Sequence, residues 1–293
     1  MTLAEYLARQ QARVDDALNR WVPPESTLPE SIHKAMRYSL FAGGKRIRPI
    51  LCMAAAEAVS DSPVGIESCA SSLELIHTYS LIHDDLPALD NDDLRRGVPT
   101  CHKVFGDAIA ILAGDALLTL AFQVLAQMDC PDNRKVAVVA ELSTAAGTVR
   151  GMIGGQVCDL EGAGQHPDAA LLEAIHRAKT GALLRASLRM GAIYAGADQE
   201  QLRALSCYGE HVGLAFQIVD DVLDVDQSSA ALGKTAGKDA QQHKITFPAV
   251  YGLERSREMA EEERLAAHLA LRPFDERAER LRELADFIVR RRA

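Results

Sequence analysis

The chain has 293 residues, of which 48% are hydrophobic and 25% are charged, a composition typical of folded globular proteins and not of disordered chains. Its formal net charge of -9 argues against a nucleic acid as a general partner, because that binding depends on basic side chains that neutralise phosphates. No shift in composition divides the chain, so a single domain over residues 1–293 is expected.

Cysteine spacing and the apolar runs predict a reduced, cytoplasmic protein. The six cysteines are scattered without a CxxC pair or a metal-ligand spacing, so reduced and mostly buried thiols are expected. Acidic residues interrupt the apolar residues at the start of the chain, which excludes the pattern of a signal peptide. We find no uninterrupted run of about 18 apolar residues and therefore expect no transmembrane segment.

Apolar residues recur three and four positions apart, as in Leu73, Ile76 and Tyr79, which is the period of a helix. Helices are predicted over residues 2–19, 29–41, 47–59, 66–86, 107–128, 133–153, 167–193, 198–225, 245–257 and 259–291. Prolines and glycines fall between these segments, and the last one is expected to split near Pro273. No alternating pattern of β-strands competes, so the predicted fold class is all-α, a large layered helical bundle.

The first candidate metal-binding cluster consists of Asp84, Asp85 and Asp90, at the end of an apolar helix. Neighbouring carboxylates at the mouth of an apolar groove require cations, and oxygen ligands suit Mg²⁺. Because Pro87 should break the helix, a turn is expected to bring Asp90 back toward Asp84. An acidic helix end followed by a solvated loop is the alternative interpretation.

The second cluster consists of Asp220, Asp221 and Asp224. Asp220 and Asp224 are four residues apart and share one helix face, where like charges repel unless a metal bridges them. Asp221 points elsewhere, to cap, to pair with a base or to bind outer-shell water. An acidic solvent face is the alternative, but apolar neighbours bury the segment on its other sides, and two such clusters in one chain favour a metal-dependent site.

Basic residues accompany both clusters. The glycine turn at 43–49 carries Lys45, Arg46 and Arg48 into a predicted helix, where backbone N–H groups favour a phosphate. The guanidinium fork binds phosphate bidentately, whereas a solvated surface role is the alternative for each lysine. The remaining basic residues near the clusters or on the mid-chain helix are Arg95, Arg96, Lys179, Lys234, Lys238 and Lys244.

Two other motifs do not explain the whole pattern. The segment Gly233-Lys234-Thr235 is not a P-loop, because position 228 is Ser where that pattern needs Gly and no strand precedes it. His83-Asp84 would suit a helical HD-type phosphohydrolase, but that interpretation leaves the second cluster and the basic turn unexplained. For His83 we expect a structural hydrogen bond.

From about Lys34 to Leu253 the chain resembles the trans-isoprenyl diphosphate synthases, specifically the bacterial-type farnesyl diphosphate synthases. The motifs that carry the resemblance are Gly-Gly-Lys-Arg-Ile-Arg-Pro at 43–49, Glu74–His77, Ser80–Gly97, Gly114-Asp115, Gly155-Gln156, Lys179-Thr180, Phe216–Asp224 and Gly233–Lys244. The resemblance implies an isoprenoid synthase fold of about ten core helices around a central cavity. It also implies that the two aspartate clusters face each other there and that the protein is a homodimer.

The resemblance further implies roles for individual residues. About three Mg²⁺ ions would bind with the diphosphate. Their ligands would be Asp84, Asp85, Asp90 and Asp220, with Asp221 and Asp224 in support. The allylic substrate, dimethylallyl or geranyl diphosphate, would contact Arg95, Lys179, Thr180, Gln217, Lys234 and Lys244. Isopentenyl diphosphate would contact Lys45, Arg48, His77 and Arg96. The catalytic set would consist of these aspartates together with Lys179 and Lys234. It would stabilise the departing diphosphate while the isopentenyl double bond attacks the allylic cation.

Product length depends on Tyr79 and Ser80, which lie about one turn, roughly 6–7 Å, before Asp84 along the helix. In similar enzymes a bulky aromatic side chain at this depth stops elongation near fifteen carbons, so Tyr79 favours farnesyl diphosphate. The alternative for Tyr79 is a core or interface aromatic residue.

Several alternative functions stay open at this stage. A geranyl or geranylgeranyl diphosphate synthase would use the same chemistry. A non-catalytic prenyltransferase subunit would be expected to lose its aspartate motifs, and both are complete here. A terpene cyclase is disfavoured, because the basic turn and the paired arginines provide for a second diphosphate.

Overall fold

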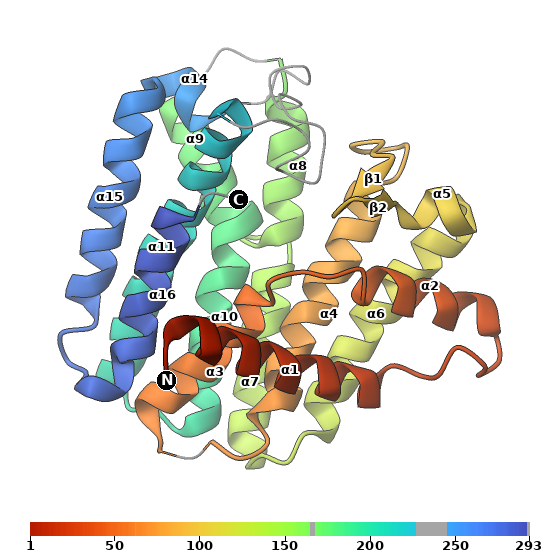
Figure 1. The fold of residues 1–293 in the computed structure, drawn as a ribbon, viewed down its shortest axis with the longest axis horizontal. Coiled ribbons are helices and arrows are strands. Elements are labelled where there is room, and N and C mark those ends of the chain that lie inside the picture. Colours follow the sequence, from red (N-terminus) through yellow and green to blue (C-terminus); the bar gives the residue numbers. More distant parts are fainter. Residues whose placement is uncertain (62, 165–167, 227–244, 292–293) are drawn as a thin grey trace. The chain divides into compact units, whose positions relative to one another are not determined.

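The computed structural model describes residues 1–61, 63–164, 168–226 and 245–291. The chain divides into two compact units (Figure 1). Unit 1 comprises Met1–Ile50 and Gly65–Pro131, and unit 2 comprises Leu51–Val64 and Asp132–Ala293. The first aspartate cluster and the basic turn therefore belong to unit 1, whereas Lys179 and the second aspartate cluster belong to unit 2.

Unit 1 is built on the long helices α4 and α6, which pack along each other. Its elements are α1 (Leu3–Trp21), α2 (Glu30–Leu40), the start of α3 (Ile47–Val59), α4 (Ile66–Asp84), β1 (Leu94–Arg95), β2 (Val98–Pro99), α5 (Cys101–Phe105) and α6 (Asp107–Gln127). The hydroxyl of Thr2 caps α1, and the carboxylate of Glu5 completes a capping box. The antiparallel pair β1–β2 forms a short hairpin after the first aspartate cluster.

Unit 2 is built on α11, which packs against α10 on one side and α15 on another. Its elements are the rest of α3, α7 (Asp132–Ala146), α8 (Met152–Gly162), α9 (Ala169–His176), the π-helical turn η1 (Arg177–Gly181), α10 (Ala182–Ala195), α11 (Gln199–Asp226), α14 (Phe247–Tyr251), α15 (Leu253–Ala270), the 3₁₀ turn η2 (Glu276–Ala278) and α16 (Glu279–Arg290). A cluster of buried apolar side chains from α9, α11, α14 and α15 forms part of its core.

The all-α prediction is confirmed, and the described residues add to it only the two-residue strands of the hairpin. Three predicted boundaries were wrong. The helix expected over 133–153 ends at Ala146 and resumes at Met152, with glycines at 147 and 151 flanking the break. The helix expected over 167–193 contains the π turn η1, and the break expected between residues 257 and 259 falls at Gly252, whose φ of 80° ends α14. The expected split near Pro273 is confirmed.

Helix α6 bears on the expectation that the chain has no transmembrane segment. Among the helices of the described ranges, Asp107–Gln127 is long and apolar enough by length and composition, with a mean hydropathy of 2.0 over its best window. The helix packs against α2, α4 and α5 within unit 1, and its buried face includes Ala113, Leu117 and Leu125. This packing is typical of a core helix.

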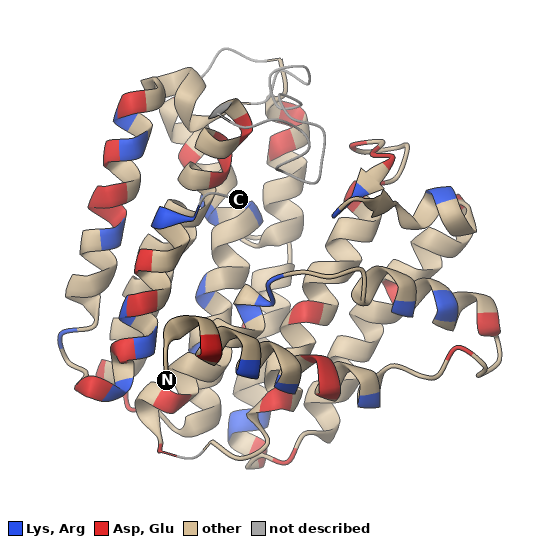
Figure 2. Cartoon of the chain, viewed as in Figure 1, with Lys and Arg blue, Asp and Glu red and all other residues tan. Residues whose placement is uncertain are grey.

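Helix α15 presents a highly charged face. Figure 2 shows acidic and basic residues interleaved along it. Arg255, for example, forms ion pairs with Glu258 at 3.1 Å and with Glu262 at 2.7 Å, all three side chains being exposed. Exposed pairs of this kind contribute about 0–1 kcal/mol each, so the helix is held mainly by the apolar face that it turns to α11.

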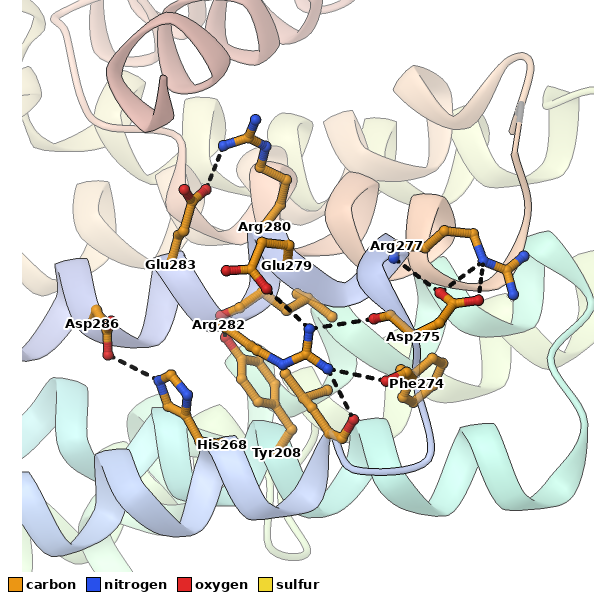
Figure 3. A network of polar contacts seen from close by, with 12 residues as sticks. Tyr208, His268, Phe274, Asp275, Arg277, Glu279, Arg280, Arg282, Glu283 and Asp286 are labelled. Atoms are coloured by element: carbon orange, nitrogen blue, oxygen red, sulfur yellow. Dashed lines mark hydrogen bonds and ion pairs between the residues drawn. The ribbon is translucent and has the colours of Figure 1, made fainter. Parts of the chain in front are cut away.

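The C-terminal helix α16 is fastened by buried polar contacts (Figure 3). The hydroxyl of Tyr208, on α11, donates a hydrogen bond of 2.6 Å to the carbonyl oxygen of Leu281. The guanidinium of Arg282 donates to the carbonyl oxygens of Phe274 at 3.0 Å and Leu271 at 3.4 Å in the preceding turn. These contacts fix the start of α16 against α11 and against the preceding turn.

A second contact joins α15 to α16. The carboxylate of Asp286 accepts a hydrogen bond of 2.6 Å from Arg264. It also pairs with His268 at 2.9 Å, as Figure 3 shows. Burial favours the neutral carboxyl, but these two partners outweigh it and lower the pKa of Asp286. The stabilisation is therefore present above the unfolded-state pKa and is lost as pH falls through the lowered pKa.

Replacing Tyr208 by Phe is expected to lower the free energy of unfolding by about 1 kcal/mol, because the buried hydroxyl loses its hydrogen bond to Leu281. Urea denaturation measures the change. Tyr251→Phe is the matched control, since Tyr251 is 39% exposed, and should leave stability unchanged. Equal stabilities of Tyr208→Phe and the parent would contradict the anchoring role of this contact.

Candidate active site

The first aspartate cluster lies where α4 ends and the chain turns back. The backbone N–H of Asp90 donates to the carbonyl oxygen of Asp84 at 2.8 Å, and that of Asp92 donates to Asp85 at 3.2 Å. Pro87 stands inside this turn and ends the helical hydrogen-bond pattern. The prediction that a turn brings Asp90 back to Asp84 is therefore confirmed.

The carboxylates of this cluster have different environments. Asp84 and Asp90 are partly exposed, whereas Asp85 is 3% exposed. The guanidinium of Arg95 donates to Asp85 from Nε at 3.1 Å and also from Nη2. Burial raises the pKa of Asp85, although Arg95 opposes this rise. The structure thus pairs a predicted metal ligand, Asp85, with a residue predicted to contact the allylic diphosphate.

The glycine turn provides room for the second arginine of the predicted pair. Gly43 and Gly44 have φ values of 96° and 128°, which favour glycine. A Cβ atom on Gly44 would lie 2.6 Å from Nη1 of Arg96, so a side chain at this position would displace the guanidinium from the turn. Nη1 of Arg96 donates to the carbonyl oxygen of Gly43. Two predicted substrate-binding motifs of unit 1 are therefore in direct contact.

Arg46 was expected to join Lys45 and Arg48 as a cation of the turn, and this expectation was wrong. Its side chain is 2% exposed and points into the core of unit 1. It donates to the carboxylates of Asp15 at 2.8 Å and Glu74 at 2.7 Å, and to the carbonyl oxygen of Leu40 at 2.8 Å. Arg46 therefore fixes the turn, while Lys45 is exposed and Arg48 is half-buried.

His77 lies in a strongly positive environment. Burial first, and then the charges of Arg48, Arg96, Arg95 and Arg46, hold its pKa well below the usual value. The imidazole is therefore neutral near pH 7 and has one N–H to donate. The residues predicted to hold isopentenyl diphosphate in unit 1 thus share a field that attracts an anion.

Tyr79 and Ser80 precede the first aspartate cluster on α4. Tyr79 is 5% exposed and packs edge-on against His83, with ring centroids 5.7 Å apart. Burial, followed by the charge of Asp84, raises its pKa to about 12. Its hydroxyl has no hydrogen-bond partner within the described ranges. The hydroxyl of Ser80 donates to the carbonyl oxygen of His77 at 2.8 Å.

The structural hydrogen bond expected for His83 is confirmed. Its Nε2 lies 3.0 Å from the carbonyl oxygen of Ile111 on α6. This contact links the end of α4 to α6 and leaves His83 with a packing role beside the aspartates.

Asp221 organises the second cluster from inside unit 2. It is 3% exposed and accepts hydrogen bonds from the side-chain amide of Gln217 at 2.8 Å and from the backbone N–H of Phe247 at 2.9 Å. His176 lies 3.4 Å away on its other side. The prediction that Asp221 points away from its neighbours to cap or to pair is confirmed, because these contacts join α11 to α9 and α14.

Asp224 and Asp220 differ in their partners. Asp224 is 7% exposed, and its Oδ1 has no hydrogen-bond partner among the residues that the structure describes. Asp220 is 41% exposed in its side chain and accepts a hydrogen bond of 2.5 Å from Nη2 of Arg291. The guanidinium of Arg291 also lies 3.9 Å from the ring centre of Phe216.

Lys179 and Thr180 lie on the π turn η1, a type of helical irregularity found often at functional sites. Lys179 Nζ is 2.6 Å from the carboxylate of Asp159, and the hydroxyl of Thr180 donates to Gln217 at 2.8 Å. A Cβ atom on Gly155 would lie 2.2 Å from the backbone nitrogen of Lys179, so this glycine permits α8 to contact the turn. The structure therefore brings Thr180, Gln217 and Asp221 into one hydrogen-bonded chain.

Sequence reasoning missed Asp159 and Arg291. Asp159 lies four residues after Gly155 on α8, so its helical spacing from the glycine motif was an available signal. Arg291 belongs to a basic run at the end of the chain, and only packing shows that it reaches Asp220. Lys234, Lys238 and Lys244 lie outside the described residues.

The described residues do not form a complete metal-binding site from protein groups alone. Over the described ranges, no group of three or more His, Cys, Asp or Glu side chains is placed to hold a metal ion. Mg²⁺ usually keeps several waters and binds through one or two carboxylates plus substrate phosphates. The partly exposed Asp84, Asp90 and Asp220 suit that kind of shared coordination.

Comparisons with known proteins decide the family. A family model described as polyprenyl synthetase matches residues 29–286. The chain belongs to the polyprenyl synthetase family. The match spans both aspartate clusters, the basic turn and the π turn, so the motifs that carry the resemblance lie inside it.

Relatives of this polyprenyl synthetase include enzymes with two product names. Farnesyl diphosphate synthase from Escherichia coli (strain K12) is 45% identical over 286 residues, covering 95% of each chain. The chloroplastic geranylgeranyl pyrophosphate synthase 12 of Arabidopsis thaliana is 50% identical over 276 residues, covering 92% of this chain and 76% of the plant protein. The crystal structure of geranylgeranyl pyrophosphate synthetase from Pyrococcus horikoshii Ot3 has a TM-score of 0.89 at 31% identity and covers 99% of this chain and 98% of its own. The chain is accordingly a prenyltransferase of the trans-isoprenyl diphosphate synthase type.

Two neighbouring cations of the polyprenyl synthetase should respond differently to replacement. Arg46→Met is expected to lower the free energy of unfolding by about 3–5 kcal/mol, because it leaves the carboxylate of Glu74 buried and unpaired. Lys45→Met should change stability by less than about 0.5 kcal/mol, since Lys45 is exposed. Chemical denaturation followed by circular dichroism compares them, and equal losses would contradict the assignment of Arg46 to the core.

Proposed function

We propose that this polyprenyl synthetase is a farnesyl diphosphate synthase, which condenses isopentenyl diphosphate with dimethylallyl diphosphate and then with geranyl diphosphate. The observation that supports the fifteen-carbon product is Tyr79, a buried aromatic side chain about one helical turn before Asp84. The Escherichia coli relative carries the same name. The Arabidopsis relative favours geranylgeranyl diphosphate as the second candidate product.

Magnesium fits the carboxylates of this chain. All donors of the two clusters are hard oxygen atoms, and the buried Oδ1 of Asp224 lacks a hydrogen-bond partner within the described part of the chain. We infer that Asp84, Asp85, Asp90 and Asp220 would hold the ions, with Asp221 and Asp224 in support. When bound, Mg²⁺ would neutralise the charge that develops on the departing diphosphate.

The basic residues would orient the two substrates. Arg95, Lys179, Thr180 and Gln217, with Lys234 and Lys244, would bind the allylic diphosphate. For Lys179, the substrate would compete with the carboxylate of Asp159, which lies 2.6 Å from its ammonium nitrogen. Isopentenyl diphosphate would be held by Lys45, Arg48, His77 and Arg96, where the neutral His77 donates one hydrogen bond without adding charge.

The reaction needs no nucleophile from the protein. The C–O bond of the allylic diphosphate breaks, and its electron pair leaves with the diphosphate. The double bond of isopentenyl diphosphate forms the new C–C bond, and a proton is then lost to the departing diphosphate. The cations around the site stabilise that leaving group, which is where negative charge develops. We propose that the working enzyme is a homodimer, as the resemblance implies.

Incubation of the purified protein with Mg²⁺, isopentenyl diphosphate and one allylic diphosphate should give a C15 product from dimethylallyl and geranyl diphosphate. Farnesyl diphosphate should not be extended, because Tyr79 limits the space for a longer chain. Chromatography of the dephosphorylated alcohols gives the product length, and EDTA provides the metal-free control. A C20 product would keep the condensation but overturn the farnesyl assignment, and no product would overturn the synthase assignment.

Replacing Tyr79 by Ala should shift the product from C15 toward C20, because the shorter side chain removes the proposed block. Tyr79→Phe is the matched control: it keeps the ring and deletes a hydroxyl that has no partner in the described residues, so C15 should persist. Circular dichroism checks that both variants are folded. A folded Tyr79→Ala enzyme with an unchanged product spectrum would show that Tyr79 is only a packing residue.

Arg291→Gln should bind a divalent cation several-fold more tightly than the parent, because the charge-assisted hydrogen bond to Asp220 no longer competes with the ion. Mn²⁺ titration followed by electron paramagnetic resonance measures the affinity without turnover. Arg290→Gln is the control, since the neighbouring Arg290 is exposed. An unchanged Mn²⁺ affinity in Arg291→Gln would contradict this competition.

A further inference from the structure

Unit 2 contains a pocket of about 350 Å³ that the proposed reaction does not use. Its lining includes Arg150 from the α7–α8 connection, Arg177, Gly181 and Arg185 from η1 and α10, and Glu210 and Leu214 from α11. A volume near 300 Å³ or more is typical of small-ligand sites. None of these side chains belongs to the predicted metal-binding or substrate-binding sets.

The pocket carries an excess of positive charge. Arg177 is neutralised by Glu173, to which its Nε and Nη2 donate at 2.9 and 2.6 Å. The Nε of Arg185 lies 3.2 Å from Oε1 of Glu210, an ion pair whose geometry in the described part of the molecule is not that of a hydrogen bond. For Arg150, the described residues supply no recorded hydrogen bond or ion pair. Among the described residues, the three guanidinium groups thus have two carboxylate partners, Glu173 and Glu210, and Glu173 lies outside the lining.

The backbone of Arg150 supports the same interpretation. Its φ of 55° is uncommon for a residue other than glycine, and such backbone conformations are found often at functional sites. The strained residue is the one that adds the unbalanced charge to the pocket. A bound anion would offset the repulsion between the guanidinium groups.

We propose that this pocket is a second binding site, separate from the proposed active site, for a small phosphate-bearing anion of the diphosphate class. Arginine presents planar pairs of N–H donors that match phosphate oxygens bidentately. Arg185 contributes an Nε–H that is ion-paired with Glu210 but makes no hydrogen bond, and Arg150 contributes an exposed guanidinium for which the described residues supply no recorded partner. Gly181 and Leu214 provide a wall without competing acceptors in their side chains.

The pocket shares its wall with the proposed substrate-binding elements. Arg177 and Gly181 belong to the same π turn as Lys179 and Thr180, whose side chains contact Asp159 and Gln217. Glu210 and Leu214 lie on α11, the helix that carries the second aspartate cluster. An anion in the pocket therefore binds to elements that also hold the proposed active-site residues, but through different side chains.

Binding of inorganic diphosphate, measured by isothermal titration calorimetry in EDTA, tests the proposal while excluding metal-dependent binding at the aspartates. The parent protein should bind diphosphate, and Arg150→Ala should bind it at least tenfold more weakly. Arg272→Ala is the control, because Arg272 is an exposed arginine outside the pocket and should leave the affinity unchanged. Inorganic phosphate, with fewer oxygen atoms for the three guanidinium groups, should bind more weakly than diphosphate.

A second measurement locates the anion. Diphosphate should protect Arg150 and Arg177 from phenylglyoxal, as mapped by mass spectrometry of peptides, and should leave Arg272 reactive. The proposal is overturned if Arg150→Ala binds like the parent, or if Arg150 stays reactive while diphosphate is bound. In that case the bound diphosphate would be at the proposed active site, and the pocket arginines would be surface ion-pair partners only.

Discussion

The position of the basic turn in unit 1 depends on the hydrogen bonds of the buried Arg46 guanidinium. It joins Asp15 on α1, the carbonyl oxygen of Leu40 at the end of α2 and Glu74 on α4. These bonds hold the glycine turn against the helix that ends in the first aspartate cluster. Asp221 has the same role in unit 2, where it joins α11 to α9 and α14. The basic turn and the second aspartate cluster therefore each have one buried residue, Arg46 or Asp221, that holds neighbouring helices together. Their other charged residues are the ones proposed to bind a ligand.

Charge pairing is the second common feature. Arg95 is paired with Asp85, Lys179 with Asp159 and Arg291 with Asp220. Each pair keeps a cation and a carboxylate together, so that neither charge is left unpaired at a partly buried position. In the proposed chemistry, a metal–diphosphate complex brings both signs of charge at once and can exchange with such pairs without leaving a buried charge alone.

The sequence predicted the element types and the chemical motifs better than it predicted which way side chains face. Helical periodicity located most helices, and Pro87 correctly indicated the turn that returns Asp90 to Asp84. Arg46 and Lys45 are adjacent and equally basic, and only the fold shows that one meets Glu74 while the other is exposed. Asp159 and Arg291 escaped detection because their partners lie 20 and 71 residues away. The π turn was not predicted, because helix propensities are the same whether or not a turn contains one extra residue.

That extra residue has an evolutionary consequence. A π turn closes i to i+5, so α10 is rotated by about 100° relative to an uninterrupted continuation of α9. Deleting one residue anywhere between Arg177 and Gly181 would restore a regular helix. The deletion would also rotate one side of the break about the helix axis, so that either Lys179 or the buried face of α10 would no longer face α11. Insertions and deletions should consequently be eliminated from this short stretch even where individual side chains can vary. Selection should therefore act on the length of this segment more strongly than on its amino-acid composition.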